Sequence, residues 1–217
     1  MSALFADRSV AGGALAQQLQ AYAGRDDVVV LALPRGGVPV AWEVAQALGA
    51  KLDVLVVCRL CVPYQTKLAL GAIAGGGAVF IDRQIVASSG VSPQQLEDVL
   101  AAGCQDLVRC RALYRGAREP AVLQGRTVIV VDDGVATGAS MHAALTALRV
   151  AKPEWIVVAV PAAPPGAQDR IGTAADEFVS VMSPPDFRSV GQYYRDFGQV
   201  SDEQVRGLLS YADLHRT

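Results

Sequence analysis

The sequence contains few aromatic residues and few charges. Phe, Trp and Tyr make up 6% of its 217 residues, charged residues make up 18%, His occurs twice, and the formal net charge is −2. This balance gives no electrostatic reason to expect binding to nucleic acid or to an anionic membrane surface. The 52% of hydrophobic residues excludes a disordered chain. The length predicts a single domain over residues 1–217.

Targeting and membrane-spanning segments are also missing. Residues 1–22 contain Asp7 and Arg8 and lack the apolar core of a signal peptide. No stretch free of Asp, Glu, Lys and Arg reaches the ~20 residues that a membrane-spanning helix needs. We therefore expect a soluble, cytoplasmic protein with no membrane partner.

Cysteine is scarce as well, and its spacing does not complete a zinc pattern. Cys58 and Cys61 form one C-x-x-C, but neither a second such pair nor a nearby His pair accompanies it. We expect reduced thiols, with Cys104 on the apolar stripe of a helix. A thioredoxin-like redox motif, which needs the C-x-x-C at a helix N-terminus, stays an alternative.

What the sequence does contain is an alternation of strand and helix patterns. Four short β-branched runs, typical of strands buried on both faces, cover residues 28–33, 52–57, 127–131 and 155–160. Apolar residues at helical spacing lie between them, over residues 38–48 and 139–150 and in a first stripe made of Val10, Ala14, Leu15, Leu19 and Tyr22. The pattern predicts an α/β fold with a mostly parallel, Rossmann-like sheet of about five strands, flanked by helices.

The middle of the chain departs from this rhythm. Residues 68–82 predict two short antiparallel strands around a turn at residues 75–77. Ser92 and Gln95 then predict a capped helix that runs to about Tyr114. Its expected buried face consists of Leu96, Val99, Leu100, Cys104, Leu107 and Val108. Ser201 and Gln204 predict a second capped helix, over residues 201–214.

Residues 128–140, VIVVDDGVATGAS, carry the strongest chemical signal. A buried strand ends in Asp132 and Asp133, and a small-residue loop leads into a helix. Backbone N–H groups of such a loop, together with the helix N-terminus, favour an anion such as phosphate. Because adjacent carboxylates repel each other, the pair indicates a ligand with hydroxyl groups or a metal.

Three other interpretations of this strand do not match the spacing. A Walker A loop is absent, so the strand does not belong to a P-loop NTPase. The two acids are contiguous, whereas a phosphatase of the haloacid dehalogenase type separates them by one residue. No G-x-G-x-x-G follows the first strand, as a dinucleotide-binding Rossmann domain would require.

The segment closely resembles the phosphoribosyl-pyrophosphate (PRPP) signature of type I phosphoribosyltransferases. In that family the acidic pair bonds the ribose 2- and 3-hydroxyls and the following loop holds the 5-phosphate. The resemblance implies these PRPP-binding residues: Asp132, Asp133, Gly134, Val135, Ala136, Thr137, Gly138, Ala139 and Ser140.

A second segment, LALPRGG at residues 31–37, resembles the pyrophosphate loop of the same family. The backbone N–H groups of Gly36 and Gly37 would meet the leaving diphosphate, and Arg35 would supply charge. Glycine is expected there because the backbone must turn sharply against the ligand. The alternative is an ordinary Pro-Arg-Gly-Gly turn.

Nearly the full chain is similar to an uncharacterised subgroup of predicted phosphoribosyltransferases, with one divergent stretch. Where that subgroup carries Arg-Lys-x-Gly and then Pro-Glu-Leu-Ala, this chain has Cys58-Arg59-Leu60-Cys61 and Thr66-Lys67-Leu68-Ala69. Arg59 preserves a positive charge, and Lys67 is either a loop cation that reaches the diphosphate or a solvated surface lysine.

The resemblance implies a pentosyltransferase that binds PRPP with Mg²⁺ held mainly by the substrate, with Arg35, Arg59, Asp132 and Asp133 as catalytic residues. It also implies a small hood, from about residues 60–116 and 184–217. The fold often pairs, so a homodimer is compatible with it. The divergent stretch leaves a second hypothesis open, a non-catalytic PRPP or nucleotide sensor.

The sequence does not identify the acceptor or a general base. Five aromatic residues are candidates for stacking on a base, although we expect most of them to pack the tail onto the body instead: Tyr64, Phe187, Tyr193, Tyr194 and Phe197. His142, one turn into the helix after the loop, is expected to be an exposed or packed helix residue and not a general base. Residues 161–163 are expected at the carboxyl edge of the sheet, where ligands of such sheets bind.

Overall fold

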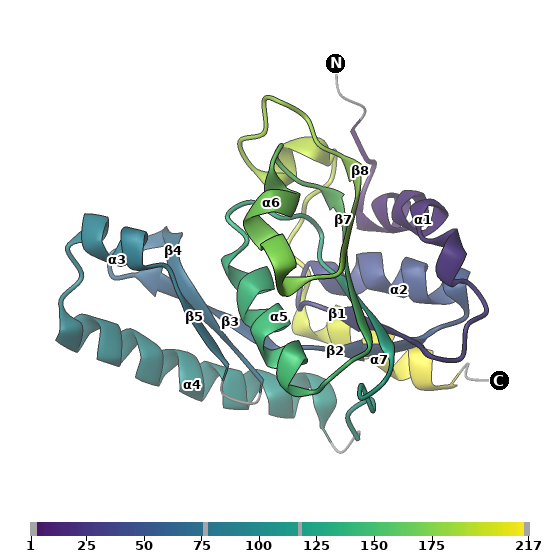
Figure 1. Cartoon of the computed structure of the whole chain (residues 1–217), viewed down its shortest axis with the longest axis horizontal. Coiled ribbons are helices and arrows are strands. Elements are labelled where there is room, and N and C mark those ends of the chain that lie inside the picture. Colours follow the sequence, from purple (N-terminus) through teal and green to yellow (C-terminus); the bar gives the residue numbers. More distant parts are fainter. Residues whose placement is uncertain (1–3, 76–77, 117–118, 215–217) are drawn as a thin grey trace.

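We describe the protein from a computed structural model, covering residues 4–75, 78–116 and 119–214, without the side chains of Lys67, Asp213 and Leu214. The expected α/β architecture is confirmed (Figure 1). Five parallel strands form the main sheet in the order β2-β1-β6-β7-β8. Their bounds are Val28–Ala32 for β1, Lys51–Val54 for β2, Thr127–Val131 for β6, Trp155–Ala162 for β7 and Glu177–Met182 for β8.

Helices cover both faces of this sheet. Figure 1 shows α1 and α2 on one side and α5 and α6 on the other, and the two hydrophobic cores divide in the same way. Every residue of β1 and β6 is buried, as their Val-rich sequences predict. The helix bounds are Arg8–Gln18 for α1, Gly37–Leu48 for α2, Ala139–Val150 for α5, Ala167–Ile171 for α6 and Asp202–Leu214 for α7, with short 3₁₀ turns at Gln20–Tyr22, Gly172–Ala174 and Val190–Tyr193.

A second, antiparallel sheet projects from this body, to the left in Figure 1. It consists of β3 (Val57–Val62), β4 (Gln65–Ala74) and β5 (Val79–Ile81), followed by α3 (Arg83–Ser89) and α4 (Pro93–Arg115). The expected hairpin is confirmed in β4 and β5. The predicted end of the strand over residues 52–57 is wrong. β2 ends at Val54, and from Val57 onward the chain forms β3, which pairs with β4.

The capped start of α4 is confirmed, but its expected buried face is partly wrong. Ser92 and Gln95 exchange both hydrogen bonds of a capping box. Cys104 is exposed and Val108 is 69% exposed, whereas Gly103 lies inside. A Cβ at Gly103 would come within 2.5 Å of Leu60 Cδ2, so the glycine lets the helix approach β3 closely. The buried face therefore passes through residue 103 rather than 104.

The apolar stripe predicted at the first helix is largely confirmed, because Leu15, Leu19 and Tyr22 are buried. Val10 is the exception: it is 53% exposed, and its neighbour Ala11 is buried instead. A Cβ at Gly12 would lie 2.7 Å from the Val40 carbonyl oxygen, so α1 packs closely on α2 along the face that contains this glycine. The expected cap of α7 is confirmed, because Ser201 and Gln204 exchange hydrogen bonds.

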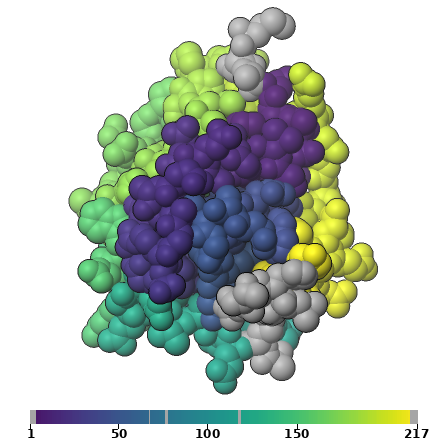
Figure 2. Space-filling model, turned by 90° about the vertical axis from the view of Figure 1, so that its right-hand side faces the viewer, coloured from purple at the N-terminus to yellow at the C-terminus, as the bar shows by residue number. Residues whose placement is uncertain are grey.

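The segment before α1 lies beside the segment that follows β8. Viewed from the α1 side, the purple N-terminal residues border the yellow C-terminal ones (Figure 2). The backbone N–H of Phe5 donates to the Tyr193 carbonyl at 2.8 Å, and the Arg195 N–H donates back to the Phe5 carbonyl at 2.9 Å. Among the described residues, no helix has the length and apolarity that crossing a membrane requires.

Candidate functional site

The loop between β6 and α5 presents unpaired backbone donors at a helix N-terminus. Gly138 precedes the helix with φ +83°, a conformation that favours glycine. Within the described residues, the N–H groups of Ala136, Thr137, Gly138 and Ser140 have no hydrogen-bond partner. Unpaired N–H groups combined with a helix N-terminus form a binding site for an anion.

The acidic pair lies at the start of this loop. Asp132 Oδ1 accepts a hydrogen bond from the Asp133 N–H at 2.9 Å, and Asp133 Oδ2 accepts one from Arg8 Nε at 2.9 Å. Burial raises the pKa of both carboxyls, and the charge of Asp133 raises the pKa of Asp132 further, while Arg8 opposes both shifts. Ligand hydroxyl groups donating to these carboxylates would offset the cost of their burial.

The Pro-Arg-Gly-Gly loop packs directly against the acidic pair. A Cβ at Gly36 would lie 2.1 Å from Asp133 Oδ2, and a Cβ at Gly37 would lie 2.7 Å from the Val131 carbonyl oxygen. Gly36 has an ordinary helical φ of −59°. The chain does turn at residues 34–36, as the sequence suggested, but the two glycines are needed there for space and not for an unusual φ.

The donors of this loop are only partly available. The Gly37 N–H donates to the Leu33 carbonyl at 3.1 Å, whereas the Gly36 N–H has no partner within the described ranges. Arg35 forms an ion pair with Asp202 of α7 at 3.6 Å, and both side chains are nearly two-fifths exposed. Arg35 thus points toward α7 in this structure, although it belongs to the loop beside the acidic pair.

A cavity of about 440 Å³ joins the acidic pair and the loop to residues from distant parts of the chain. Arg59 of β3 lines it. Arg188 and Val190 line it too, and neither was predicted, because nothing in their local sequence pattern marks them. A Cβ at Gly134 would lie 2.6 Å from Val190 Cγ1, so the segment after β8, which we call the tail, packs closely on the loop between β6 and α5. The lining residues are Arg59, Asp132, Asp133, Gly134, Val135, Ala136, Thr137, Gly138, Ala139, Ser140, Met141, Arg188, Val190 and Phe197.

Of the five aromatic candidates, Phe197 alone is among these lining residues. Tyr64 is 98% exposed in the turn between β3 and β4. Tyr193 and Tyr194 are buried, and Phe187 stacks on Tyr193 with ring centroids 5.3 Å apart. Four of the candidates are therefore surface or packing residues.

Other residues singled out in the sequence have ordinary structural places. His142 stacks on Phe80 at 4.8 Å, which confirms its packing role. Cys58 lies in β3 and not at a helix N-terminus, and burial and the neighbouring Cys110 raise the pKa of its thiol to about 12. This protonated thiol does not suit a thioredoxin-like motif. The backbone of Lys67 lies in β4, but its side chain is outside the described part of the chain.

Ala162 places the end of β7 against the loop, because its carbonyl accepts the Val135 N–H at 3.0 Å. The expected position of residues 161–163 at the carboxyl edge of the sheet is thereby confirmed.

A Mg²⁺ site made by the protein alone does not occur among the described residues, where no three His, Cys, Asp or Glu side chains gather. Asp132 and Asp133 are the carboxylates that line the cavity, and Arg8 already pairs with one of them. Because Mg²⁺ commonly keeps several waters and binds through substrate phosphates, an ion that arrives with a phosphorylated ligand would be held mainly by that ligand.

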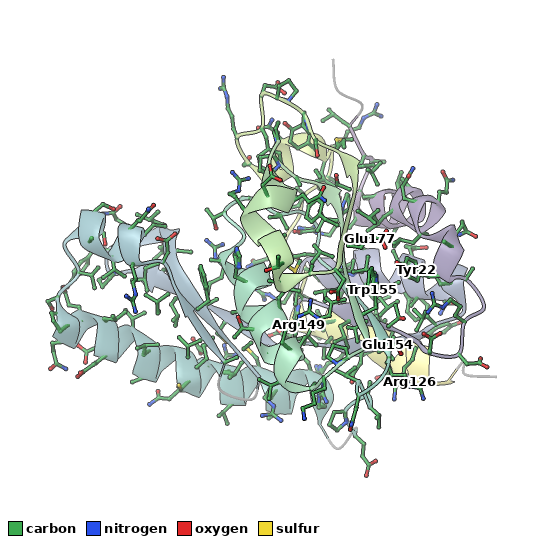
Figure 3. The ribbon with its side chains drawn as sticks, viewed as in Figure 1. Tyr22, Arg126, Arg149, Glu154, Trp155 and Glu177 are labelled. Atoms are coloured by element: carbon green, nitrogen blue, oxygen red, sulfur yellow. The ribbon has the colours of Figure 1, made fainter. Side chains whose placement is uncertain are left out.

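A second polar cavity lies at the opposite, amino end of the strands (Figure 3). Trp155 and Glu177 begin β7 and β8 there, and the Tyr22 hydroxyl donates to Glu177. Burial and this hydrogen bond raise the pKa of Tyr22 to about 12. Arg25 pairs with Asp27 at 2.7 Å. These groups largely pair with one another by hydrogen bonds and ion pairs. The cavity lined by Asp132, Asp133 and the loop, which we call the carboxyl-edge cavity, is therefore the better candidate site.

Comparison with known proteins gives a consistent result. Residues 7–197 match the family model described as "Phosphoribosyl transferase domain". Over 209 residues the chain is 43% identical to a protein of Mycobacterium tuberculosis named "Putative phosphoribosyl transferase", a match that covers 96% of this chain and 47% of that protein. The chain therefore spans about half the length of the curated relatives it matches.

Solved structures agree on the fold. The crystal structure of TT1426 from Thermus thermophilus superposes with a TM-score of 0.77 at 43% sequence identity, covering 95% of this chain and 97% of that one. A Neisseria gonorrhoeae protein with bound ppGpp superposes with a TM-score of 0.54, over 96% of each chain. At 14% identity, that second likeness shows the fold alone.

Proposed function

The chain belongs to the phosphoribosyl transferase domain family, and from that premise we propose that it binds PRPP in the carboxyl-edge cavity. It transfers the 5-phosphoribosyl group to a nitrogenous base or a related nucleophile and releases pyrophosphate. One observation carries this proposal: the acidic pair and the unpaired N–H groups of one continuous segment line the same cavity. A sugar with two hydroxyls and a nearby phosphate matches that combination of acceptors and donors.

Each part of PRPP has complementary groups in this arrangement. The 5-phosphate accepts hydrogen bonds from the N–H groups of Thr137, Gly138 and Ser140, at the N-terminus of α5. The 2- and 3-hydroxyls of the ribose donate to Asp132 and Asp133. Sugar and phosphate are thereby held by residues eight positions or fewer apart.

The pyrophosphate end lies toward Arg59 and the unpaired N–H of Gly36. A cation about 4 Å from the leaving group contributes up to ~4 kcal/mol at an effective dielectric constant of about 20. Mg²⁺ bound with PRPP would neutralise part of the charge that develops on the pyrophosphate. Arg35 adds a second cation only if its side chain leaves Asp202. The protein's contribution is thus positioning and charge stabilisation, not covalent catalysis.

We place the acceptor beside Phe197 and Arg188, which line the cavity from the segment after β8. In this proposal the hood over the site consists of residues from about 60–116 and 184–217. The presence of Arg188 and Phe197 in the cavity lining supports this assignment. A homodimeric state stays a prediction, and we propose the cytoplasm as the place of action.

Two measurements test the proposal. Calorimetry with PRPP and Mg²⁺ should show binding, and Asp132→Asn or Asp133→Asn should each weaken it by at least about 10-fold, because each removes a charged hydrogen-bond acceptor. Asp169→Asn, which changes an exposed acid on α6, is the matched control and should bind normally. Absence of PRPP binding by the unaltered protein would overturn the proposal.

The second measurement concerns turnover. The protein, at high concentration, is incubated with PRPP, Mg²⁺ and a pool of purine, pyrimidine and pyridine bases, and pyrophosphate release is followed. Release with at least one base supports the transferase.

A non-catalytic PRPP sensor is the second candidate function. The pairing of Arg35 with Asp202, away from the cavity lining, favours it because the expected leaving-group cation is engaged elsewhere. Tight PRPP binding without pyrophosphate release from any base would select the sensor over the transferase.

A further inference from the structure

Arg8, the first residue of α1, reaches the acidic pair from the other end of the chain. Its Nε donates to Asp133 Oδ2 at 2.9 Å, although 125 positions separate the two residues. The side chains are 12% and 14% exposed, so the ion pair is largely shielded from solvent. Nothing in the local sequence around Arg8 indicates a role in this site.

Two further contacts fix the guanidinium. Its Nη1 donates to the Gly198 carbonyl at 2.7 Å, and its central carbon lies 4.0 Å from the centroid of the Phe197 ring. The hydroxyl of Tyr194, from the same tail segment, donates to the Asp133 backbone carbonyl at 2.6 Å. Asp133 is therefore held at its side chain and at its backbone by residues from both ends of the chain.

The ion pair with Arg8 engages one of the two carboxylate oxygens of Asp133. Arg8 contacts Oδ2, and Asp133 Oδ1 has no hydrogen-bond partner in the portion of the chain that is described. Since Asp133 lines the cavity, Oδ1 is the oxygen that a ligand hydroxyl could approach. A two-pronged Arg–carboxylate pair would have occupied both oxygens.

We propose that Arg8 is a positioning residue, which orients the Asp133 carboxylate so that Oδ1 stays free for a ribose hydroxyl of PRPP. This inference rests on the proposed function and goes beyond it. By this inference α1 and the segment after β8 belong to the site. Arg8 connects the carboxylate of Asp133 to the ring of Phe197, which lines the cavity.

The charges around Asp133 explain why a cation is needed there. Asp132 precedes Asp133 in the loop, and Tyr194 faces Asp133 from the segment after β8. Two cations lie nearby: Arg59 of β3, whose charge lowers the pKa of Asp132, and Arg8 of α1, which faces Asp133. Burial raises the pKa of the Asp133 carboxyl, and Arg8 lowers it through its charge and its hydrogen bond. Removing Arg8 therefore raises this pKa further, so protonation begins at a higher pH.

The test compares PRPP affinity across a pH series, from mildly acidic to mildly basic, in the full chain with Mg²⁺. In Arg8→Gln the affinity should fall by ~10-fold or more at the acidic end, because the unpaired carboxyl takes up a proton, and should recover as the pH rises. Arg170→Gln, which removes an exposed arginine of α6, is the control and should keep the original profile. A purely structural role for Arg8 would lower the affinity equally at every pH.

Two further measurements keep the outcomes distinct. Arg8→Lys keeps the charge but cannot make both hydrogen bonds and the ring contact, so its pH profile should stay unchanged while its affinity falls several-fold. Carboxyl ¹³C NMR without PRPP should show a higher Asp133 pKa in Arg8→Gln than in the unaltered protein.

An Arg8→Gln variant with the original pH profile and the original Asp133 pKa would overturn the inference. If Arg8→Gln does not fold, an Arg8→Lys variant with undiminished PRPP affinity would overturn it. If the unaltered protein binds no PRPP, the proposed function fails, while the NMR shift still shows whether Arg8 holds Asp133 ionised.

Discussion

The two sides of the cavity are assembled in different ways. The loop side comes from one continuous segment, residues 132–141, whose shape follows from a buried strand, a glycine with positive φ and a helix start. The outer side, which we define as Arg59, Arg188, Val190 and Phe197, gathers residues from β3 and the tail. A local change can disable the loop side, whereas the outer side depends on how distant elements pack.

This difference separates two tasks. The loop side supplies donors and acceptors that suit the invariant part of a ligand, a sugar and its phosphate. In the proposed function, the outer side supplies Arg59, Arg188 and an aromatic ring to the leaving pyrophosphate and the acceptor. Arg8 connects the sides, because it contacts Asp133 on one and Phe197 on the other.

The largest effect is expected where the loop side tolerates no extra atom. Gly36→Ala places a Cβ 2.1 Å from Asp133 Oδ2, so the acidic pair must shift. We expect loss of measurable PRPP binding in calorimetry and a stability loss of about 1–3 kcal/mol in urea unfolding. Gly13→Ala, in α1 with nothing within 4 Å, is the control and should stabilise by up to about 1 kcal/mol. Normal PRPP affinity in Gly36→Ala would show that the pair is not held in this position.

The second prediction concerns the attachment of the antiparallel sheet that carries Arg59. Arg115, at the end of α4, pairs with the buried Asp53 of β2 at 3.4 Å and donates to the Val54 carbonyl at 2.8 Å. Arg115→Met leaves Asp53 buried without its cation and should cost about 3 kcal/mol of unfolding free energy. Arg111→Met, which changes an exposed arginine of the same helix, should cost little. Equal unfolding midpoints for the two variants would contradict this account.

The third prediction follows from the raised pKa of Asp132, which burial and the charge of Asp133 cause. Because the folded-state pKa lies above that of the unfolded chain, stability falls as the pH rises through the interval between the two values. Asp132→Asn removes this cost, so at neutral pH its Tm should be higher than that of the unaltered protein, although it binds PRPP poorly. The gain in Tm should vanish at low pH, where the Asp132 carboxyl is protonated and, like the amide of Asn, carries no charge.

Asp169→Asn, an exposed substitution, is the matched control and should leave Tm unchanged. A lower Tm for Asp132→Asn at neutral pH would mean that the carboxylate stabilises the empty site.

The smallest stability effect is expected for Arg35. Its partly exposed ion pair with Asp202 contributes about 0–1 kcal/mol, so Arg35→Gln should barely change the unfolding free energy. If Arg35 moves to the leaving pyrophosphate during turnover, pyrophosphate release should nevertheless fall by at least about 10-fold. Unchanged release would assign the pyrophosphate to the outer side alone.

The features that the sequence predicted correctly are those coded by consecutive residues. The strand, Asp132-Asp133, the loop and the helix follow one another in thirteen residues, so spacing alone indicates the arrangement. The capping box of Ser92 and Gln95 is equally local. In each case the physical requirement, buried strand or capped helix, is met within a few positions.

The features that were missed depend on packing between distant elements. β3 was not expected, because β2 ends at Val54 within an apolar run whose composition does not change. The buried face of α4 passes through Gly103 because Leu60 lies against it, which no helical periodicity indicates. Arg8 and Arg188 reach the site only after the chain has folded.

The most direct test of the central claim is a crystal structure with PRPP and Mg²⁺. The account predicts the 5-phosphate within hydrogen-bonding distance of the Thr137 and Gly138 N–H groups, and the ribose hydroxyls on Asp132 and Asp133. A phosphate bound away from this loop, or an empty cavity at saturating PRPP, would contradict it.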